Sequence, residues 1–159
     1  MKREAGDMAT LVVVPCGKGK IWDRYPDAGA TPARTAYTGA PFVKNREYAE
    51  AFADRWVILS ARYGFIDPDF AIPGPYDVTF NDPTTDPIPV EELRRQVREK
   101  GLASFEVVVA LGSAKYAGKT QAAFTTSRAR VCAPVAHLPM FEMMRAVSEA
   151  INLRRPFEC

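Results

Sequence analysis

The first turn of the chain places a thiol, two glycines and two lysines at the end of a short apolar run. Residues 11–14 read Leu-Val-Val-Val, and Pro-Cys-Gly-Lys-Gly-Lys follows them. Free backbone amides and lysines in such a turn can bind an anion, and nearby ammonium groups lower the pKa of a thiol. Cys16 is therefore a candidate nucleophile, and Lys18 and Lys20 are candidates for lowering its pKa or binding phosphate. The alternative is a small core cysteine beside solvated lysines.

Other patterns narrow the chemistry of this turn. It lacks the GxxxxGK[ST] spacing of a phosphate loop, which argues against a nucleoside triphosphatase. His137 is the single histidine and is distant in sequence from Cys16, so a structural or exposed histidine is favoured over a Cys–His dyad. The three cysteines form neither an even set nor a CxxC pair. We therefore expect reduced thiols, inert Cys132 and Cys159, and no metal site.

Four tyrosines lie in or beside glycine-bearing turns. They are Tyr37, Tyr63, Tyr76 and Tyr116. One tyrosine of this kind is ordinary packing, whereas four that converge on one crevice suit stacking on a nucleobase. Asp77, beside Tyr76, is the acidic residue best placed to act as a general base or to accept hydrogen bonds from a base edge.

Three apolar runs predict the strands that position these residues. They occupy residues 11–14, 56–59 and 105–111, and each is followed by small or polar residues and a glycine. Helices are predicted over residues 41–54, 90–100, 114–124 and 140–153, and an edge strand over residues 131–135. Residues 23–40 and 65–89 are rich in proline, glycine and small polar residues, which predicts two long functional loops.

The alternation of strands and helices predicts one three-layer α/β domain over residues 10–159. Its sheet should be mostly parallel, with four or five strands, and residues 1–9 should form a loose N-terminal segment. The strand ends at Cys16, Ser60 and Gly112 should then gather at one edge of the sheet. In open α/β sheets that edge is where ligands bind.

Composition and charge set the broad class of the protein. The chain has 159 residues, of which 47% are hydrophobic and 25% charged, as in ordinary globular domains. No apolar stretch approaches the roughly 20 residues of a membrane span, and the N-terminus has no apolar signal core, so we expect a cytoplasmic protein without a membrane partner. The net charge is +2, but charges between Tyr63 and Leu93 are all acidic and those between Val107 and Phe141 all basic. A phosphate-bearing partner follows if the basic residues share a face; a solvated mixed surface is the alternative.

Four motifs in one order resemble the YaaA peroxide-stress family and its smaller relatives. They are Tyr37-Thr38-Gly39, residues 59–68 (Leu-Ser-Ala-Arg-Tyr-Gly-Phe-Ile-Asp-Pro), Pro75-Tyr76, and residues 111–116 (Leu-Gly-Ser-Ala-Lys-Tyr). The opening turn differs from that family, because Pro15-Cys16 with a following lysine is more similar to the proline-cysteine-serine-x-lysine motif of the archaeosine synthase core domain. That enzyme modifies a deazaguanine base in transfer RNA, and the YaaA resemblance implies DNA binding.

The residues and the resemblance together predict an enzyme that acts on a nucleobase or nucleotide, with a deazaguanine-type base in nucleic acid as one substrate. Cys16 would be the nucleophile, Asp77 would move protons, and Ser60 would hold polar substrate atoms. The substrate-binding positions would be Lys18, Lys20, Tyr37, Gly39, Tyr63, Gly64, Tyr76, Gly112, Ser113 and Tyr116. No cofactor is expected.

Two other functions stay open. One is a non-catalytic DNA- or RNA-binding module of the YaaA type linked to stress response, whose affinity should fall steeply with salt. The other is a redox sensor that uses Cys16.

Overall fold

The computed structural model describes residues 9–159. The expectation of a loose segment over residues 1–9 therefore lies outside the described residues, except at Ala9. The Ala9 carbonyl accepts hydrogen bonds from the amides of Glu106 and Val107, which joins this residue to the sheet.

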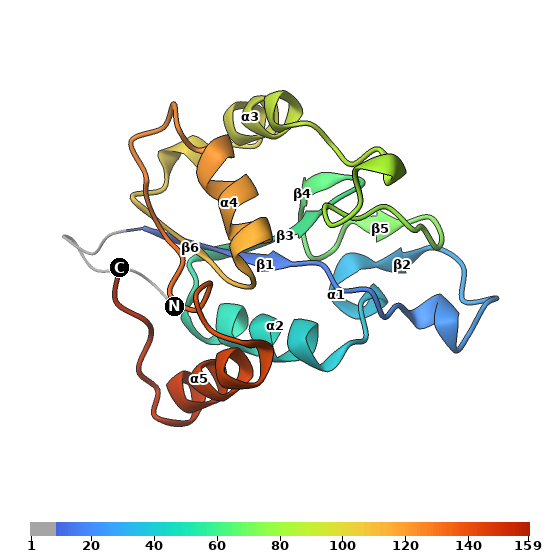
Figure 1. The fold of residues 1–159 in the computed structure, drawn as a ribbon, viewed down its shortest axis with the longest axis horizontal. Coiled ribbons are helices and arrows are strands. Elements are labelled where there is room, and N and C mark those ends of the chain that lie inside the picture. Colours follow the sequence, from blue (N-terminus) through green and yellow to red (C-terminus); the bar gives the residue numbers. More distant parts are fainter. Residues whose placement is uncertain (1–8) are drawn as a thin grey trace.

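A five-stranded sheet in the order β4-β3-β1-β6-β7 forms the centre of the domain (Figure 1). Its strands are β1 (Thr10–Pro15), β3 (Arg55–Ser60), β4 (Gly64–Ile66), β6 (Val107–Ala110) and β7 (Arg130–Cys132). All neighbouring pairs are parallel except β3 with β4. The predicted α/β class with a mostly parallel sheet is thus confirmed, and the apolar run of residues 11–14 is its fully buried central strand.

Helices cover both faces of this sheet, as a three-layer architecture requires. They are α2 (Ala40–Phe52), α3 (Val90–Glu99), α4 (Ala114–Ala123) and α5 (Met140–Asn152). Successive side chains of a strand point to opposite faces. Val12 and Val14 accordingly share a core with residues of α2 and α5, whereas Leu11 and Val13 share the other core with residues of α3 and the end of α4. Each helix begins and ends within two residues of its predicted bounds.

The two predicted loops contain only short elements. The first holds β2 (Thr31–Pro32) and α1 (Ala33–Ala36), and it begins at the last residue of η1 (Ile21–Asp23). The second begins within β4 and holds β5 (Ala71–Ile72) and η2 (Pro83–Thr85). Strands β2 and β5 pair antiparallel, so the two loops lie side by side at one end of the domain (Figure 1). Over residues 9–159, no helix is both long enough and apolar enough to cross a membrane.

Strand boundaries differ from the predictions where short turns intervene. The predicted strand 105–111 shortens to β6 because residues just before it form η3 (Leu102–Ser104). The predicted edge strand 131–135 is β7 and ends at Cys132. Strand β4 was not predicted, because a strand of three residues after a tight turn is too short to show an alternation of apolar and polar residues.

The expectation of three reduced thiols is wrong for two of them. Cys132, at the end of β7, and Cys159 form a disulfide with their Cα atoms 5.4 Å apart. The segment after α5 also packs on α2, where Phe157 stacks on Tyr48 and donates its amide hydrogen to the Tyr48 hydroxyl. Cys132 and Cys159 are 27 residues apart in the sequence, and no sequence pattern indicates that they lie close together in the fold. Cys16 is a free cysteine.

We predict that denatured, unreduced protein contains one titratable thiol per chain and that reduced protein contains three. The disulfide removes Cys132 and Cys159 from the first count, and Cys16 supplies the remaining thiol. Titration with Ellman's reagent measures both values, and Cys16→Ser should lower each by one. Three thiols in protein that was never reduced would contradict the disulfide.

Two glycines sit where a side chain cannot be accommodated. Gly112, directly after the strand that ends at Ala110, has φ +93°, and a Cβ there would lie 2.5 Å from Cγ of Pro15 on β1. Gly64 has φ +79°, and a Cβ there would overlap the side chain of Gln96. Glycine is needed at both positions because the left-handed backbone and the close approach each exclude other residues.

Gly112→Ala should therefore destabilise the protein by about 2–4 kcal/mol, from backbone strain together with overlap with Pro15. Gly118→Ala is the matched control. Gly118 lies within α4, and a Cβ added there would meet nothing within 4 Å, so alanine should stabilise by about 0.5–1 kcal/mol. Urea unfolding measures both changes. Equal effects of the two substitutions would show that the close approach at Gly112 does not matter.

Candidate functional site

The carboxyl ends of β1, β3 and β6 lie next to one another. The Cys16 amide donates to the carbonyl of Leu59 on β3, and the Leu111 amide donates to Val13 on β1. These bonds continue the parallel ladders past the ends of the strands. The predicted gathering of the turns at Cys16, Ser60 and Gly112 is thus present.

A cavity of about 370 Å³ opens at this edge. One wall comes from the turn after β1 and another from residues 77–81 of the second loop, with Tyr116 of α4 between them. Its lining residues are Cys16, Gly17, Lys18, Lys20, Asp77, Val78, Thr79, Asn81 and Tyr116. The fold therefore brings five of the predicted site residues together, namely Cys16, Lys18, Lys20, Asp77 and Tyr116. We call this space the polar cavity.

Lys20 places a buried positive charge beside the polar cavity. Its side chain is only 8% exposed, and its Nζ donates one hydrogen bond, 3.1 Å long, to the Lys18 carbonyl. The ammonium lies 4.6 Å from the centre of the Tyr76 ring, and it forms no ion pair with any residue of the described chain. An ammonium has three donors, so this one keeps hydrogen-bonding capacity for an anionic ligand.

Ser60 is fully buried and lines neither the polar cavity nor its neighbours, so it cannot hold substrate atoms directly as expected. Its Oγ accepts hydrogen bonds from the amides of Arg62 and Tyr63, which occupies both lone pairs. Its proton is left to be donated to the Tyr76 hydroxyl, 3.0 Å away. Tyr76 is in turn hydrogen-bonded to the buried Tyr37 hydroxyl. The role of Ser60 is therefore to position Tyr76.

The four tyrosines occupy four different environments. Tyr116 lines the polar cavity, and Tyr76 lines an adjoining one with Lys18, Lys20 and Asp77. Tyr37 is buried beneath Tyr76. Tyr63 packs edge-on against Tyr76 with ring centres 5.5 Å apart and faces a different cavity. The four rings are close, but only two of them border the space around Cys16.

Residue Cys16 is half-buried, its thiol lies on the buried side, and its Sγ is 3.9 Å from the Tyr116 hydroxyl. Burial raises the pKa of this thiol. Hydrogen bonds with the Ala61 backbone and with the Tyr116 and Tyr76 side chains lower this pKa, as does the charge of Lys20, but burial has the larger effect. Lys20 does lower the pKa of Cys16, as expected. The expectation of a lowered pKa is wrong, however, because the net change is an increase. Burial, and then the nearby Cys16, likewise raise the pKa of Tyr116 to about 12.

A second cavity of about 360 Å³ adjoins the first, and both are lined by Cys16, Gly17, Lys18, Asn81 and Tyr116. Its other lining comes from the end of β1 and the turn after it, the start of α2, the start of α4 and the first turns of α5. Those residues are Pro15, Gly19, Gly39, Pro41, Phe42, Asn45, Gly112, Ser113, Met140, Met143 and Met144. We call this space the methionine-lined cavity. Cys16 stands at the junction of a polar space and an apolar one.

Several lining residues were not predicted from the sequence. Asn45 lies on the buried face of α2, three residues after Phe42, and a polar residue on an apolar stripe is a signal that sequence reasoning had available. The methionines of α5 read as ordinary core residues. The predicted site residues Gly39, Gly112 and Ser113 line the methionine-lined cavity, whereas Gly64 is buried against Gln96.

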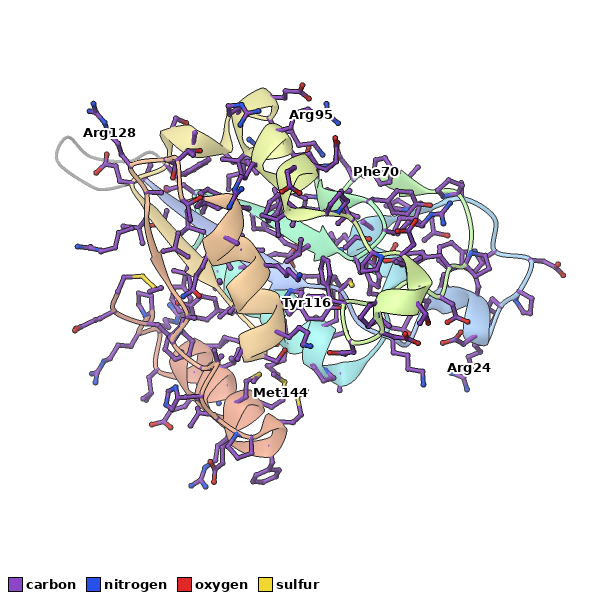
Figure 2. All side chains as sticks on the ribbon, turned by 45° about the horizontal axis from the view of Figure 1, so that its top comes forward. Arg24, Phe70, Arg95, Tyr116, Arg128 and Met144 are labelled. Atoms are coloured by element: carbon purple, nitrogen blue, oxygen red, sulfur yellow. A yellow bond between two sulfur atoms is a disulfide. The ribbon has the colours of Figure 1, made fainter. Side chains whose placement is uncertain are left out.

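His137 and the remaining basic residues lie apart from this site. His137 is exposed and lines neither cavity. Arg24 and Arg128 lie at opposite ends of the molecule, with Tyr116 between them (Figure 2), and Arg34 pairs with Glu50. Arg24 and Arg128 therefore do not belong to one compact basic cluster. Among residues 9–159 there is no group of three or more His, Cys, Asp or Glu side chains placed to hold a metal ion.

Comparison with known proteins identifies the family. A family model described as a family of unknown function (DUF6884) matches residues 11–149. The chain belongs to this family. The uncharacterized protein YfjM of Bacillus subtilis (strain 168) is 49% identical over 110 residues, which cover 69% of this chain and 73% of YfjM. No solved structure matches the chain. The DUF6884 match extends from β1 into α5 and includes every residue that lines the two cavities.

The raised pKa of Cys16 predicts slow alkylation at neutral pH, because only the thiolate reacts. The rate constant for iodoacetamide should rise with pH to an inflection above that of a free cysteine. Lys20→Met should move the inflection higher still, since it removes a charge that lowers the pKa. Arg128→Met, which removes a distant charge, should leave it unchanged. An inflection at or below that of free cysteine would contradict the role of burial.

Proposed function

We propose that this protein is an enzyme that acts on a nucleobase or nucleotide and uses Cys16 as its nucleophile. The observation that supports this most is the grouping of a thiol, a buried ammonium without a counter-ion and a carboxylate around one cavity, provided by Cys16, Lys20 and Asp77. Following the YaaA-like motifs, we propose a deazaguanine-type base in nucleic acid as one substrate within this class. The two adjoining cavities are each within the range of small-molecule sites, about 300–1,000 Å³.

The phosphate of such a substrate would bind near Lys18 and Lys20. Both lysines line the polar cavity and the adjoining cavity beside Tyr76. An anion there would therefore be stabilised by two ammonium groups. The starts of α2 and α4 line the methionine-lined cavity instead, so they do not form part of this anion site.

The chemistry proposed for Cys16 is addition to an electrophilic carbon of a carbon–nitrogen multiple bond. The C–S bond forms while the π electron pair moves to nitrogen. The thiol proton passes to the Asp77 carboxylate, directly or through water, and from there to that nitrogen. The net change is addition of S–H across the bond, so neither an oxidant nor a reductant is consumed. Because burial keeps the thiol protonated, a base such as Asp77 is needed to start the reaction.

One observation favours a second candidate, a non-catalytic module that binds nucleic acid. The Cys16 thiol is protonated and packs near Tyr116, as a cysteine with only a structural role would, and a binding module needs no nucleophile. The wide separation of Arg24 and Arg128 weighs against a single basic patch that contains both and binds a phosphate backbone.

Intact-protein mass spectrometry with a deazaguanine that carries a nitrile tests the enzyme proposal. Wild-type protein should gain the mass of one probe molecule, and Cys16→Ser should gain none. Cys132 and Cys159 are not free to react, so the adduct should map to Cys16. An adduct of equal yield on Cys16→Ser, or none on the wild-type protein, would remove the nucleophile from the proposal.

Binding measurements separate the two candidate functions. By calorimetry, Lys20→Met should bind guanosine 5′-monophosphate at least about tenfold more weakly than wild-type protein, a loss of about 1.4 kcal/mol. Arg128→Met should bind normally. A non-catalytic module would instead prefer an oligonucleotide, with an affinity that falls steeply as salt concentration rises.

A further inference from the structure

Asn45 is a buried polar residue whose hydrogen-bonding groups are unused. It lies on α2 with 1% of its surface exposed, and its Oδ1 has no hydrogen-bond partner. Its side-chain amide makes no hydrogen bond to any described residue. A buried polar group without a partner is destabilising, so a residue of this kind in an apolar core needs an explanation.

The surroundings of Asn45 indicate what would use it. Asn45 lines the methionine-lined cavity, which has Phe42 and the methionines of α5 on one side. On another side, Gly17, Gly19, Gly39 and Gly112 expose backbone without side chains. Methionine adapts its shape to an aromatic ring and makes favourable sulfur contacts with it, and glycines allow a flat group to approach the backbone closely. The cavity therefore suits a flat ring with apolar faces.

The charge of the group is also constrained. No acidic or basic residue lines the methionine-lined cavity except Lys18, which is exposed and shared with the polar cavity. Burying a charge among apolar side chains is unfavourable, whereas a neutral ring can satisfy Asn45 at its edge. We therefore expect the phosphate to bind near Lys18 and Lys20 and the ring to bind in the methionine-lined cavity.

We propose that Asn45 is a specificity-determining residue that pairs with the hydrogen-bonding edge of a heterocycle seated in the methionine-lined cavity. A carboxamide presents one acceptor and a donor side by side, which complements a base edge that presents a donor next to an acceptor. Cys16 lines both cavities, so a ring bound in this way lies beside the thiol while its phosphate lies near Lys20. This inference rests on the proposed action on nucleotides and names the residue that selects the base.

Calorimetry with guanosine 5′-monophosphate, adenosine 5′-monophosphate and ribose 5-phosphate tests the proposal. Asn45→Leu should weaken binding of the nucleotide that wild-type protein prefers at least tenfold, because the paired edge of the base loses its partner. Its affinity for ribose 5-phosphate, which has no base, should stay within twofold of wild type. Lys20→Met should weaken binding of all three ligands.

Asn45→Asp provides a second variant of the same shape. An ionised aspartate only accepts hydrogen bonds, and the guanine edge offers two neighbouring donors, at N1 and N2, that stabilise the ionised form. The ratio of guanosine to adenosine monophosphate affinity should therefore rise at least fivefold. Thermal unfolding of both Asn45 variants shows that they are folded, and Asn45→Leu should be at least as stable as wild type because it removes an unpaired polar group.

The outcomes separate this inference from the proposed function. If wild-type protein binds a nucleotide and both Asn45 variants bind the same nucleotides with unchanged preference, Asn45 does not select the base, and the proposed function stands. If Asn45→Leu loses ribose 5-phosphate as well, the residue supports the fold rather than the base. If wild-type protein binds none of the three ligands, both proposals fail.

Discussion

The pairing of β1 with a parallel neighbour on each side is the constraint on which the site depends. Both faces of this strand are apolar and buried, so a shift by one residue would not expose a hydrophobic face to water, as it would in an amphipathic strand. The register must be fixed by other contacts. The hydrogen bond from the Cys16 amide to Leu59 and the close approach of Gly112 to Pro15 both act at the carboxyl end of β1. The contacts that fix the strand are thus the ones that place the thiol.

Lys20 is a buried cation that forms no ion pair among the described residues, although Asp77 lines the same cavities. Burial raises the pKa of Cys16, Tyr37 and Tyr76, so these groups carry no negative charge at neutral pH to balance Lys20. The electron-rich face of the Tyr76 ring offers partial compensation. Ser60 matters here because it holds Tyr76 by a hydrogen bond whose direction is set by two backbone amides.

Much of the fold could be predicted from the sequence because its signals are local. Buried parallel strands are continuous apolar runs, and helix bounds follow from periodicity, proline and glycine. The grouping of Cys16, Lys18, Lys20 and Tyr116 could also be predicted, since they follow parallel strands whose carboxyl ends meet at one edge. Asp77 lies in the second loop, and only its position next to Tyr76 pointed to this site. The net pKa of Cys16 could not, because it depends on how tightly the surrounding loops pack. Nor could the pairing of Cys132 with Cys159, which depends on the path of the chain after α5.

That disulfide also affects how the site is built. The bond closes a covalent ring that runs from the end of β7 through the whole of α5 to Cys159. In the chain-entropy model, closing a ring of this length lowers the conformational entropy of the unfolded chain and so stabilises the folded protein by about 3–4 kcal/mol. Met140, Met143 and Met144 belong to this ring, whereas Cys16, Lys20 and Asp77 do not. The two cavities that meet at Cys16 therefore differ in what stabilises their walls. The α5 wall of the methionine-lined cavity is held by a covalent bond, whereas the polar cavity depends on packing and hydrogen bonds of the loops.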